Sequence, residues 1–335
     1  MIEKPVRYID CYVPVDACNF RCEYCYILKN KDFNDKSYIP FSKPVEQIAI
    51  ALSKERFGGA MFLNFCGDGE TLLHPLLVPL IEVLLNEHYI QIVTNGTIQE
   101  EMDKLFSLPN HLQERLYIKF SFHYLELINK GLLTRFIENV EKAKSLGISF
   151  IIELMAADCY VQYIDEITDL SIKHFGALPH IQDVREINSN LNRATKQDLN
   201  SHIQTWNVFE SKLFSFRVDT WNNNPADFFC HAGEYLYTLS LATGDLFKCY
   251  CACKIMNIYD DINEQIQINP VGYKCCFSRC YNNHVFDCLV GVVPEKKSPT
   301  YAEIRDRVCT DGTNWLTPLW QKLYSMRICD NRSGV

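Results

Sequence analysis

Strand-like and helix-like segments alternate along the first half of the chain, and this alternation constrains the fold more than any other feature. Short apolar runs predict six strands, at 7–13, 60–65, 89–94, 116–122, 148–154 and 180–187. Segments with helical apolar spacing lie between them, at 45–57, 76–87, 98–107, 131–146 and 161–175. Strands that alternate with helices form parallel βα units. We therefore expect an α/β fold, an open or partial (β/α)6 barrel of the TIM type, over residues 1–190.

The composition changes after about residue 190. Residues 191–229 are polar and rich in Asn, and they predict a connector with a helix at 203–214. From Cys230 onward, ten cysteines fall within about one hundred residues. Residues 230–335 are therefore expected to form a second, smaller, Cys-rich α+β module.

Composition and charge narrow the functional classes. The chain has 335 residues, 47% of them hydrophobic, and a formal net charge of −8. This charge and the lack of a basic run argue against nucleic acid as the main substrate. We find no signal segment and no apolar stretch long enough for a membrane span, which predicts a cytoplasmic protein.

In a reducing compartment, sixteen cysteines point to metal binding or catalysis before disulfides. Isolated cysteines can also act as small buried apolar residues. We assign that role to Cys11, Cys66 and Cys159.

Three cysteines, Cys18, Cys22 and Cys25, share a short loop after the first predicted strand. Thiolates hold iron–sulfur clusters, and three local ligands leave one iron with an open position. The next cysteine, Cys66, lies beyond a full predicted helix. Structural zinc is the alternative, but zinc sites usually present C-x2-C pairs.

The C-x3-C-x2-C spacing, with an aromatic residue before the third Cys, resembles the signature of the radical S-adenosylmethionine (SAM) superfamily. The resemblance implies a [4Fe–4S] cluster whose open iron chelates SAM, and a reductant such as flavodoxin or ferredoxin. One electron would then cleave SAM to a 5′-deoxyadenosyl radical that abstracts hydrogen from substrate, in an enclosed and dry site. Tyr24 would lie near the adenine.

The end of the second predicted strand carries Gly67, Asp68, Gly69 and Glu70. This segment resembles the family's Gly-Gly-Glu type motif, which meets the methionyl ammonium of SAM. Gly69 and Glu70 match that motif, whereas Asp68 stands where the family has its first glycine. A plain turn rich in Gly and Asp is the alternative.

The next three strands carry further SAM-binding candidates by the same resemblance. Thr94 and Asn95 begin a Thr-Asn-Gly turn, Ser121 matches a serine that commonly contacts SAM, and Glu153 falls in the region of ribose and adenine contacts. His123 lies two residues after Ser121, on the same strand face, and is a candidate for substrate contact. A structural role is the alternative for this histidine.

In the C-terminal module, residues 234–241 and 245–249 predict a hairpin with Cys230 and Cys249 at its ends. Together with Cys276 and Cys280, these thiols resemble the SPASM and twitch extensions of radical SAM enzymes, which implies an auxiliary [4Fe–4S] cluster. The later SPASM cysteine run is missing, so the twitch type fits better. Cys275 and Cys288 are alternative ligands, Cys251 and Cys253 are candidate hydrogen donors, and structural zinc is the rival.

Members with such extensions modify peptides, sulfatases, or sugar and aminocyclitol substrates. We therefore expect oxidation, crosslinking or epimerisation of a peptide or protein, or of a carbohydrate-like small molecule. The first predicted strand starts by residue 7, so no leader-binding domain fits before it. This makes a peptide substrate less favoured without eliminating it. The rivals are a non-catalytic two-cluster electron-transfer protein and a nucleic-acid-modifying radical SAM enzyme.

Overall fold

Six parallel strands form the centre of the molecule. A computed structural model describes residues 2–28, 38–186, 192–250, 253–280 and 282–332. The strands are β1 (Arg7–Tyr12), β2 (Met61–Cys66), β3 (Tyr89–Thr94), β4 (Leu116–Ser121), β5 (Ser149–Met155) and β6 (His180–Gln182). They lie in the order β6-β5-β4-β3-β2-β1, each parallel to the next, and the sheet does not close. The predicted partial (β/α)6 barrel is confirmed.

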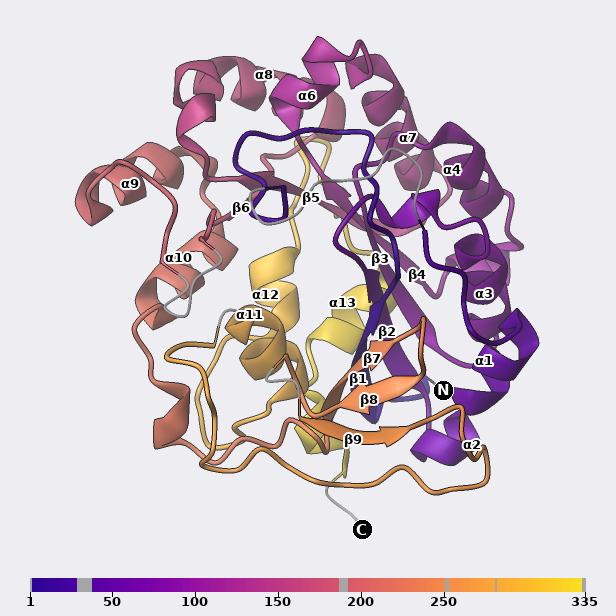
Figure 1. Ribbon diagram of the computed structural model, residues 1–335. Coiled ribbons are helices and arrows are strands. Elements are labelled where there is room, and N and C mark those ends of the chain that lie inside the picture. The colour runs from indigo at the N-terminus through magenta and orange to yellow at the C-terminus, as the bar shows by residue number, and fades with distance from the viewer. Residues whose placement is uncertain (1, 29–37, 187–191, 251–252, 281, 333–335) are drawn as a thin grey trace.

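Helices between the strands cover the outer face of this sheet, in indigo to rose in Figure 1. They are α1 (Val45–Ala51), α2 (Lys54–Phe57), α3 (Leu77–Leu84), α4 (Gln99–Phe106), α5 (Asn110–Gln113), α6 (Tyr124–Asn129), α7 (Leu133–Ser145) and α8 (Ile164–Phe175). Their buried positions repeat with helical spacing, as Phe136, Val140 and Ala143 do on α7. Burial of this stripe against the sheet fixes each helix in place.

Two predicted helices are interrupted. The segment 45–57 divides into α1 and α2, because Ser53 takes an extended conformation and begins the second helix. The single helix predicted at 203–214 is wrong. The chain instead forms α9 (Leu199–Trp206) and α10 (Lys212–Thr220), and Ser211 caps α10 by accepting a hydrogen bond from the backbone N–H of Phe214. Between them a 3-10 turn, Asn207–Phe209, follows α9, and Glu210, with a φ of +48°, ends that turn.

The C-terminal region continues the same sheet. Strand β7 (Leu236–Ser240) pairs in parallel with β1, and β8 (Asp245–Phe247) and β9 (Lys254–Asn257) follow antiparallel. The predicted hairpin is thus β7 and β8, and it extends the barrel sheet at its β1 edge. The predicted boundary at residue 230 does not coincide with a break in the sheet.

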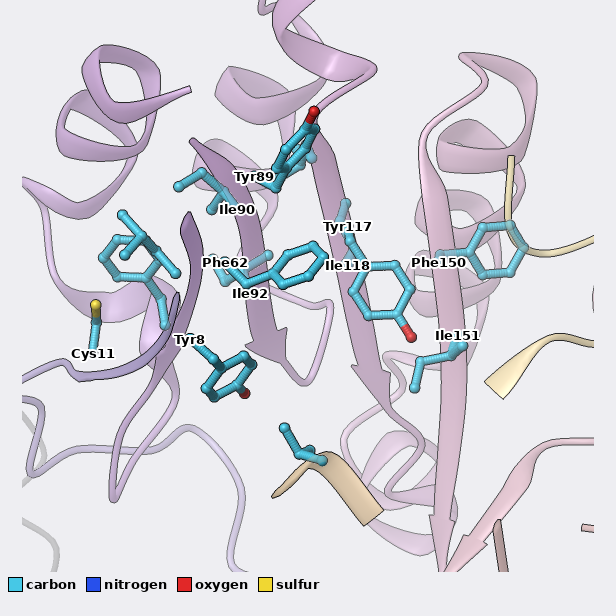
Figure 2. Close-up of a cluster of buried hydrophobic side chains, with 14 of the residues drawn as sticks. Tyr8, Cys11, Phe62, Tyr89, Ile90, Ile92, Tyr117, Ile118, Phe150 and Ile151 are labelled. Carbon is cyan, nitrogen blue, oxygen red and sulfur yellow. The ribbon is translucent and has the colours of Figure 1, made fainter. Parts of the chain in front are cut away.

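The end of the chain packs against the inner face of the sheet, where α11 (Asn283–Val285), α12 (Tyr301–Arg305) and α13 (Pro318–Tyr324) lie (Figure 1). Trp320 of α13 stacks on Phe62 and Tyr117, with ring centroids 5.8 and 5.2 Å apart. Figure 2 shows Tyr8 and Cys11 projecting to opposite sides of β1, as their odd spacing requires. This aromatic plug fills the inner face near the amino ends of the strands.

No helix in the described ranges is long and apolar enough to cross a membrane.

Candidate functional site

The three-cysteine loop, residues 18–25, runs from the carboxyl end of β1 along the segment that follows β2. The backbone N–H of Gly69 donates to the Val15 carbonyl at 3.1 Å, and that of Glu70 donates to the Ala17 carbonyl at 2.9 Å. A Cβ atom at Gly69 would lie 1.8 Å from the Ala17 carbonyl oxygen. Gly69 is therefore required by the close approach of the loop, a reason that its place in a motif did not reveal.

An amide network joins the same loop to the end of β3. Asn95 donates from Nδ2 to Asn19 Oδ1 at 2.7 Å, and Asn19 donates from its own Nδ2 to Thr97 Oγ1 at 2.9 Å. Thr97 in turn donates to Asn95 Oδ1 from its backbone and its hydroxyl. Asn95 was predicted as a site residue. Asn19 and Thr97 were missed, although Asn19 directly follows the first cysteine of the loop.

The Glu70 carboxylate lies buried between the ends of β2 and β3. It accepts hydrogen bonds from the Thr94 hydroxyl at 2.6 Å, from the Asn95 backbone N–H at 2.7 Å and from the Leu72 backbone N–H at 3.0 Å. A carboxylate offers about four acceptor positions, so about one is left for a further donor. The structure thus brings together Glu70, Thr94 and Asn95, three of the SAM-binding candidates named from the sequence.

The thiols of the loop lie near one another. Burial, followed by the charge of Glu70, raises the pKa of Cys18 to about 12, and the Cys25 thiol adds to this rise. Burial also raises the pKa of Cys22, with smaller contributions from Cys18 and Cys25. The Phe20 backbone N–H donates to Cys18 Sγ at 3.4 Å, a bond that favours a thiolate there.

This donor set fits an iron–sulfur cluster by its chemistry. Among the described residues, no three His, Cys, Asp or Glu side chains converge as the ligands of one metal ion do. Thiolates are the ligands of iron–sulfur clusters, and each thiolate of a cubane cluster binds a different iron. Three cysteines within one short loop are compatible with such a cluster.

Aromatic side chains form one side of the loop. Tyr24 OH lies 2.6 Å from His123 Nδ1 and 2.8 Å from Tyr160 OH. Phe20 contacts the His123 ring edge-on, with centroids 5.9 Å apart. Burial lowers the pKa of His123 to about 4, so its imidazole is neutral at pH 7. The sequence indicated Tyr24 and His123, but Tyr160 comes from the segment after β5 and was missed.

The remaining barrel candidates lie further along the strand ends. Ser121 and Glu153 are register partners on β4 and β5. Glu153 forms an ion pair with Arg305 of α12 and accepts a hydrogen bond from Gln182 Nε2 at 3.0 Å. Burial opposes its ionisation, but the charges of Arg305 and Lys119 hold the pKa of Glu153 below its usual range. Its carboxylate is thus already engaged by protein groups.

A belt of polar side chains crosses the inner face below the strand ends, and sequence patterns did not indicate it. Lys119 Nζ donates to Asn64 Oδ1 at 2.9 Å, and Asn64 Nδ2 donates to Asp10 Oδ1 at 2.7 Å. The Tyr250 hydroxyl donates to Asp10 Oδ2 at 2.5 Å and so ties the C-terminal region to β1. Burial, with the charge of Arg305, lowers the pKa of Lys119 to about 8.

The C-terminal cysteines divide into an enclosed and an exposed group. Cys230 pairs with Gly272 through two backbone hydrogen bonds. Burial raises the pKa of Cys280, and the charges of Asp287, Cys230 and Cys275 raise it further. Cys253 and Cys276 are exposed and line the same surface hollow.

Three further cysteines of the C-terminal region and Asp68 were also candidates from the sequence. Cys249 is half-buried just beyond β8, and Cys251 lies outside the described residues. Cys288 is fully buried. Asp68 lies beside Tyr12, whose hydroxyl has its pKa raised by burial and by this carboxylate.

The isolated cysteines differ from one another. Cys11 is fully buried, as predicted for a small apolar residue. Cys66 and Cys159 are half-buried. Cys66 lies at the end of β2, where the charges of Asp10 and Lys119 act on its thiol.

The molecule is thus a parallel α/β protein that carries a three-cysteine loop at its strand ends. Residues 12–157 match the sequence model of the Radical SAM superfamily. The match covers less than half of the chain, and it makes this part of the chain similar to that superfamily. No curated protein matched the chain.

Solved structures share this fold. Streptococcus suis SuiB bound to S-adenosylmethionine is 15% identical, with a TM-score of 0.53, and the match covers 79% of this chain and 66% of SuiB, just under two thirds of its length. Native anSMEcpe with bound AdoMet is 14% identical, with a TM-score of 0.55 and coverages of 77% and 80%. SuiB has also been solved with its precursor peptide SuiA, and anSMEcpe with the Cp18Cys peptide.

Proposed function

We propose that the chain is a radical SAM enzyme that cleaves SAM reductively at a [4Fe–4S] cluster held by Cys18, Cys22 and Cys25. The observation that carries this proposal is the attachment of the loop to two strand ends, through Gly69 and through the Asn19–Asn95 hydrogen bond. Such attachment holds three thiols in place at the edge where parallel sheets bind ligands. A non-catalytic electron carrier has no need of this arrangement.

A reduced [4Fe–4S] cluster held by Cys18, Cys22 and Cys25 would supply the electron for cleavage of SAM to methionine and a 5′-deoxyadenosyl radical. The residues of the chain bind and orient SAM. Glu70 has about one acceptor position left for the methionyl ammonium, and Thr94 and Asn95 fix the orientation of its carboxylate. The half-buried Tyr24 ring, anchored by its hydroxyl to His123 and Tyr160, offers a surface for the adenine.

The substrate of this chemistry is proposed to be a peptide or protein side chain. Two structures of the same fold contain bound peptides, which supports this class. The reaction would then be an oxidation, a crosslink or an epimerisation. A carbohydrate-like small molecule is the second candidate, and the net charge of −8 speaks against nucleic acid.

We further infer an auxiliary cluster bound by Cys230, Cys249, Cys275 and Cys280. The backbone pairing of Cys230 with Gly272 and the effect of Cys230 and Cys275 on the pKa of Cys280 support these ligands. Cys275 replaces Cys276, which was expected to be the ligand from its place in the sequence, because Cys276 is exposed. A flavodoxin or ferredoxin remains the expected reductant.

The test is the production of 5′-deoxyadenosine by anaerobically reconstituted protein with dithionite and SAM. The wild type is expected to form it, and a Cys18→Ala/Cys22→Ala/Cys25→Ala variant is expected to form none. The variant should retain about four of about eight irons, those of the auxiliary cluster. Formation of 5′-deoxyadenosine by the variant would overturn the proposal.

A further inference from the structure

Four arginines gather at the β6 edge of the sheet, where the barrel stays open. Arg185 and Arg193 pair across an isolated backbone bridge beyond β6. Arg217 lies on α10, and Arg279 lies in the segment between Cys276 and Cys280. In Figure 1, α10 stands beside β6, α11 and α12, so it occupies the gap that the open sheet leaves. We call Arg193, Arg217 and Arg279 the arginine cluster.

Trp221, the residue after α10, is the centre of the arginine cluster. The Cζ atoms of Arg193, Arg279 and Arg217 lie 4.0, 5.2 and 6.0 Å from the centroid of its ring. Three guanidinium groups around one indole bring like charges close together. An aromatic face attracts a cation, but it does not neutralise it.

The carboxylates near the arginine cluster already have partners. Two of them act through their charge on Arg217, Asp183 and Glu153. Asp183 lies 3.0 Å from His202 Nε2 and 3.3 Å from Arg193 Nε. Glu153 holds Arg305. Each of these two carboxylates thus acts on more than one cationic side chain.

Arg217 donates from Nη1 to His284 Nδ1 at 3.1 Å, but the other two arginines of the cluster have donors without acceptors. Arg193 Nη2 and Arg279 Nε are buried without a hydrogen-bond partner among the described residues. Arg217 is itself only 5% exposed. A buried guanidinium requires acceptors, and burial of like charges together is unfavourable unless an anion joins them. Guanidinium groups bind oxyanions through two parallel N–H donors. The arrangement of the arginine cluster therefore fits an oxyanion site.

Arg185, the bridge partner of Arg193, connects the arginine cluster to the residue that follows the three-cysteine loop. Arg185 Nη2 donates to the Tyr26 hydroxyl at 3.3 Å, and its Cζ lies 5.1 Å from the centroid of the Tyr26 ring. Tyr26 directly follows Cys25. A ligand held by the arginine cluster therefore lies on the side of the barrel where the proposed radical forms.

We propose that the arginine cluster is the subsite for an oxyanion of the substrate, a carboxylate or a phosphate. This inference rests on the proposed function. The subsite would bind one group of the substrate while hydrogen is abstracted from another part of the same substrate. A carboxylate would indicate an acidic side chain or a chain end of a peptide. A phosphate would indicate a phosphorylated sugar.

The test measures anion binding without turnover, as the shift in the thermal unfolding midpoint of the full, anaerobically reconstituted chain. Potassium phosphate and potassium acetate are titrated against potassium chloride at equal ionic strength. A bound anion raises the midpoint in a saturable way, whereas a general salt effect does not saturate. We expect a saturable shift with one of the two probes in the wild type.

Arg193→Gln is expected to raise the dissociation constant of that probe by about tenfold to a hundredfold, because it removes a charge-assisted contact. Arg193→Lys keeps the charge but loses the two-pronged guanidinium group. Its dissociation constant should lie between those of the wild type and Arg193→Gln. Lys212→Gln, an exposed cation on the same helix α10, is the matched control and should leave the constant unchanged.

A saturable shift with phosphate alone supports a phosphorylated substrate, and one with acetate alone supports a carboxylate. Equal behaviour of wild type, Arg193→Gln and Lys212→Gln with both probes overturns the subsite. Formation of 5′-deoxyadenosine without substrate is independent of these outcomes. Failure of the subsite and failure of the SAM chemistry are therefore distinguishable.

Discussion

The two cysteine-bearing regions of the molecule differ in what holds them. In the three-cysteine loop, the backbone pairs with the segment after β2, and Asn19 bonds to Asn95 at the end of β3. The described residues from 258 to 280 have no helix or strand, and Cys276 is exposed there. The first region is attached to the ends of two sheet strands, whereas the second is attached to residues 230–233, which lie outside any strand of the sheet.

This difference indicates two ways to build a cluster site. A loop that is fixed before the cofactor binds keeps its ligands, and the surrounding SAM contacts, in one geometry. A segment with little regular structure gains part of its folding free energy from the metal itself. We expect the barrel site to be sensitive to backbone displacement and the C-terminal site to be sensitive to loss of its metal.

Gly69→Ala is expected to have the largest effect. The new Cβ would lie 1.8 Å from the Ala17 carbonyl oxygen, so the loop must move. We expect iron to fall from about eight to about four per chain, with no 5′-deoxyadenosine formed. Iron analysis and product quantification measure both.

Gly131→Ala is the control for this substitution. Its Cβ would meet nothing within 4 Å, although its φ of +65° adds backbone strain of about 1 kcal/mol. It should keep full iron content and SAM cleavage. If Gly69→Ala behaves like Gly131→Ala, the loop does not depend on this close approach.

Much of the barrel was predictable because its signals are local. Alternating apolar runs placed β1 to β5 within one or two residues, and the spacing of Cys18, Cys22 and Cys25 indicated the loop. The parallel pairing of β7 with β1 joins segments more than two hundred residues apart, and a local hairpin pattern does not reveal it.

The missed parts of the site are likewise contacts between distant residues. Asn19 meets Thr97 and Glu153 meets Arg305 across long stretches of chain. A single Asn or Arg in a loop carries no pattern that names its partner. The residue types predicted which side chains could bind a cofactor. Their contacts with distant residues follow only from the folded structure.

Loss of the auxiliary metal is expected to loosen the C-terminal region and to spare the barrel. In Cys280→Ala, trypsin should cut after Lys248 or Lys274 about tenfold faster, because local opening becomes more frequent without the cluster. Residues 7–186 should resist as they do in the wild type. Mass spectrometry of timed digests identifies the cut sites.

Cys159→Ala is the matched control, since it removes a half-buried thiol from the barrel side. Its digestion should match the wild type at Lys248 and Lys274. Equal digestion of Cys280→Ala and wild type would mean that the chain alone orders the C-terminal region, and the contrast between the two regions would be lost.

The smallest expected effect, and the sharpest test of the second site, comes from two adjacent thiols. Cys275 acts on the enclosed Cys280 thiol, whereas Cys276 is exposed on a surface hollow. A cluster ligand must reach the same cluster as the other cysteine ligands. Cys275→Ser should therefore lose about four irons. Cys276→Ser should leave iron content and the spectrum of the reduced clusters unchanged. Iron analysis with electron paramagnetic resonance separates the two variants. The reverse result would move the ligand to Cys276, and it would require the segment to rearrange when metal binds, which is the behaviour expected of a site ordered by its cofactor.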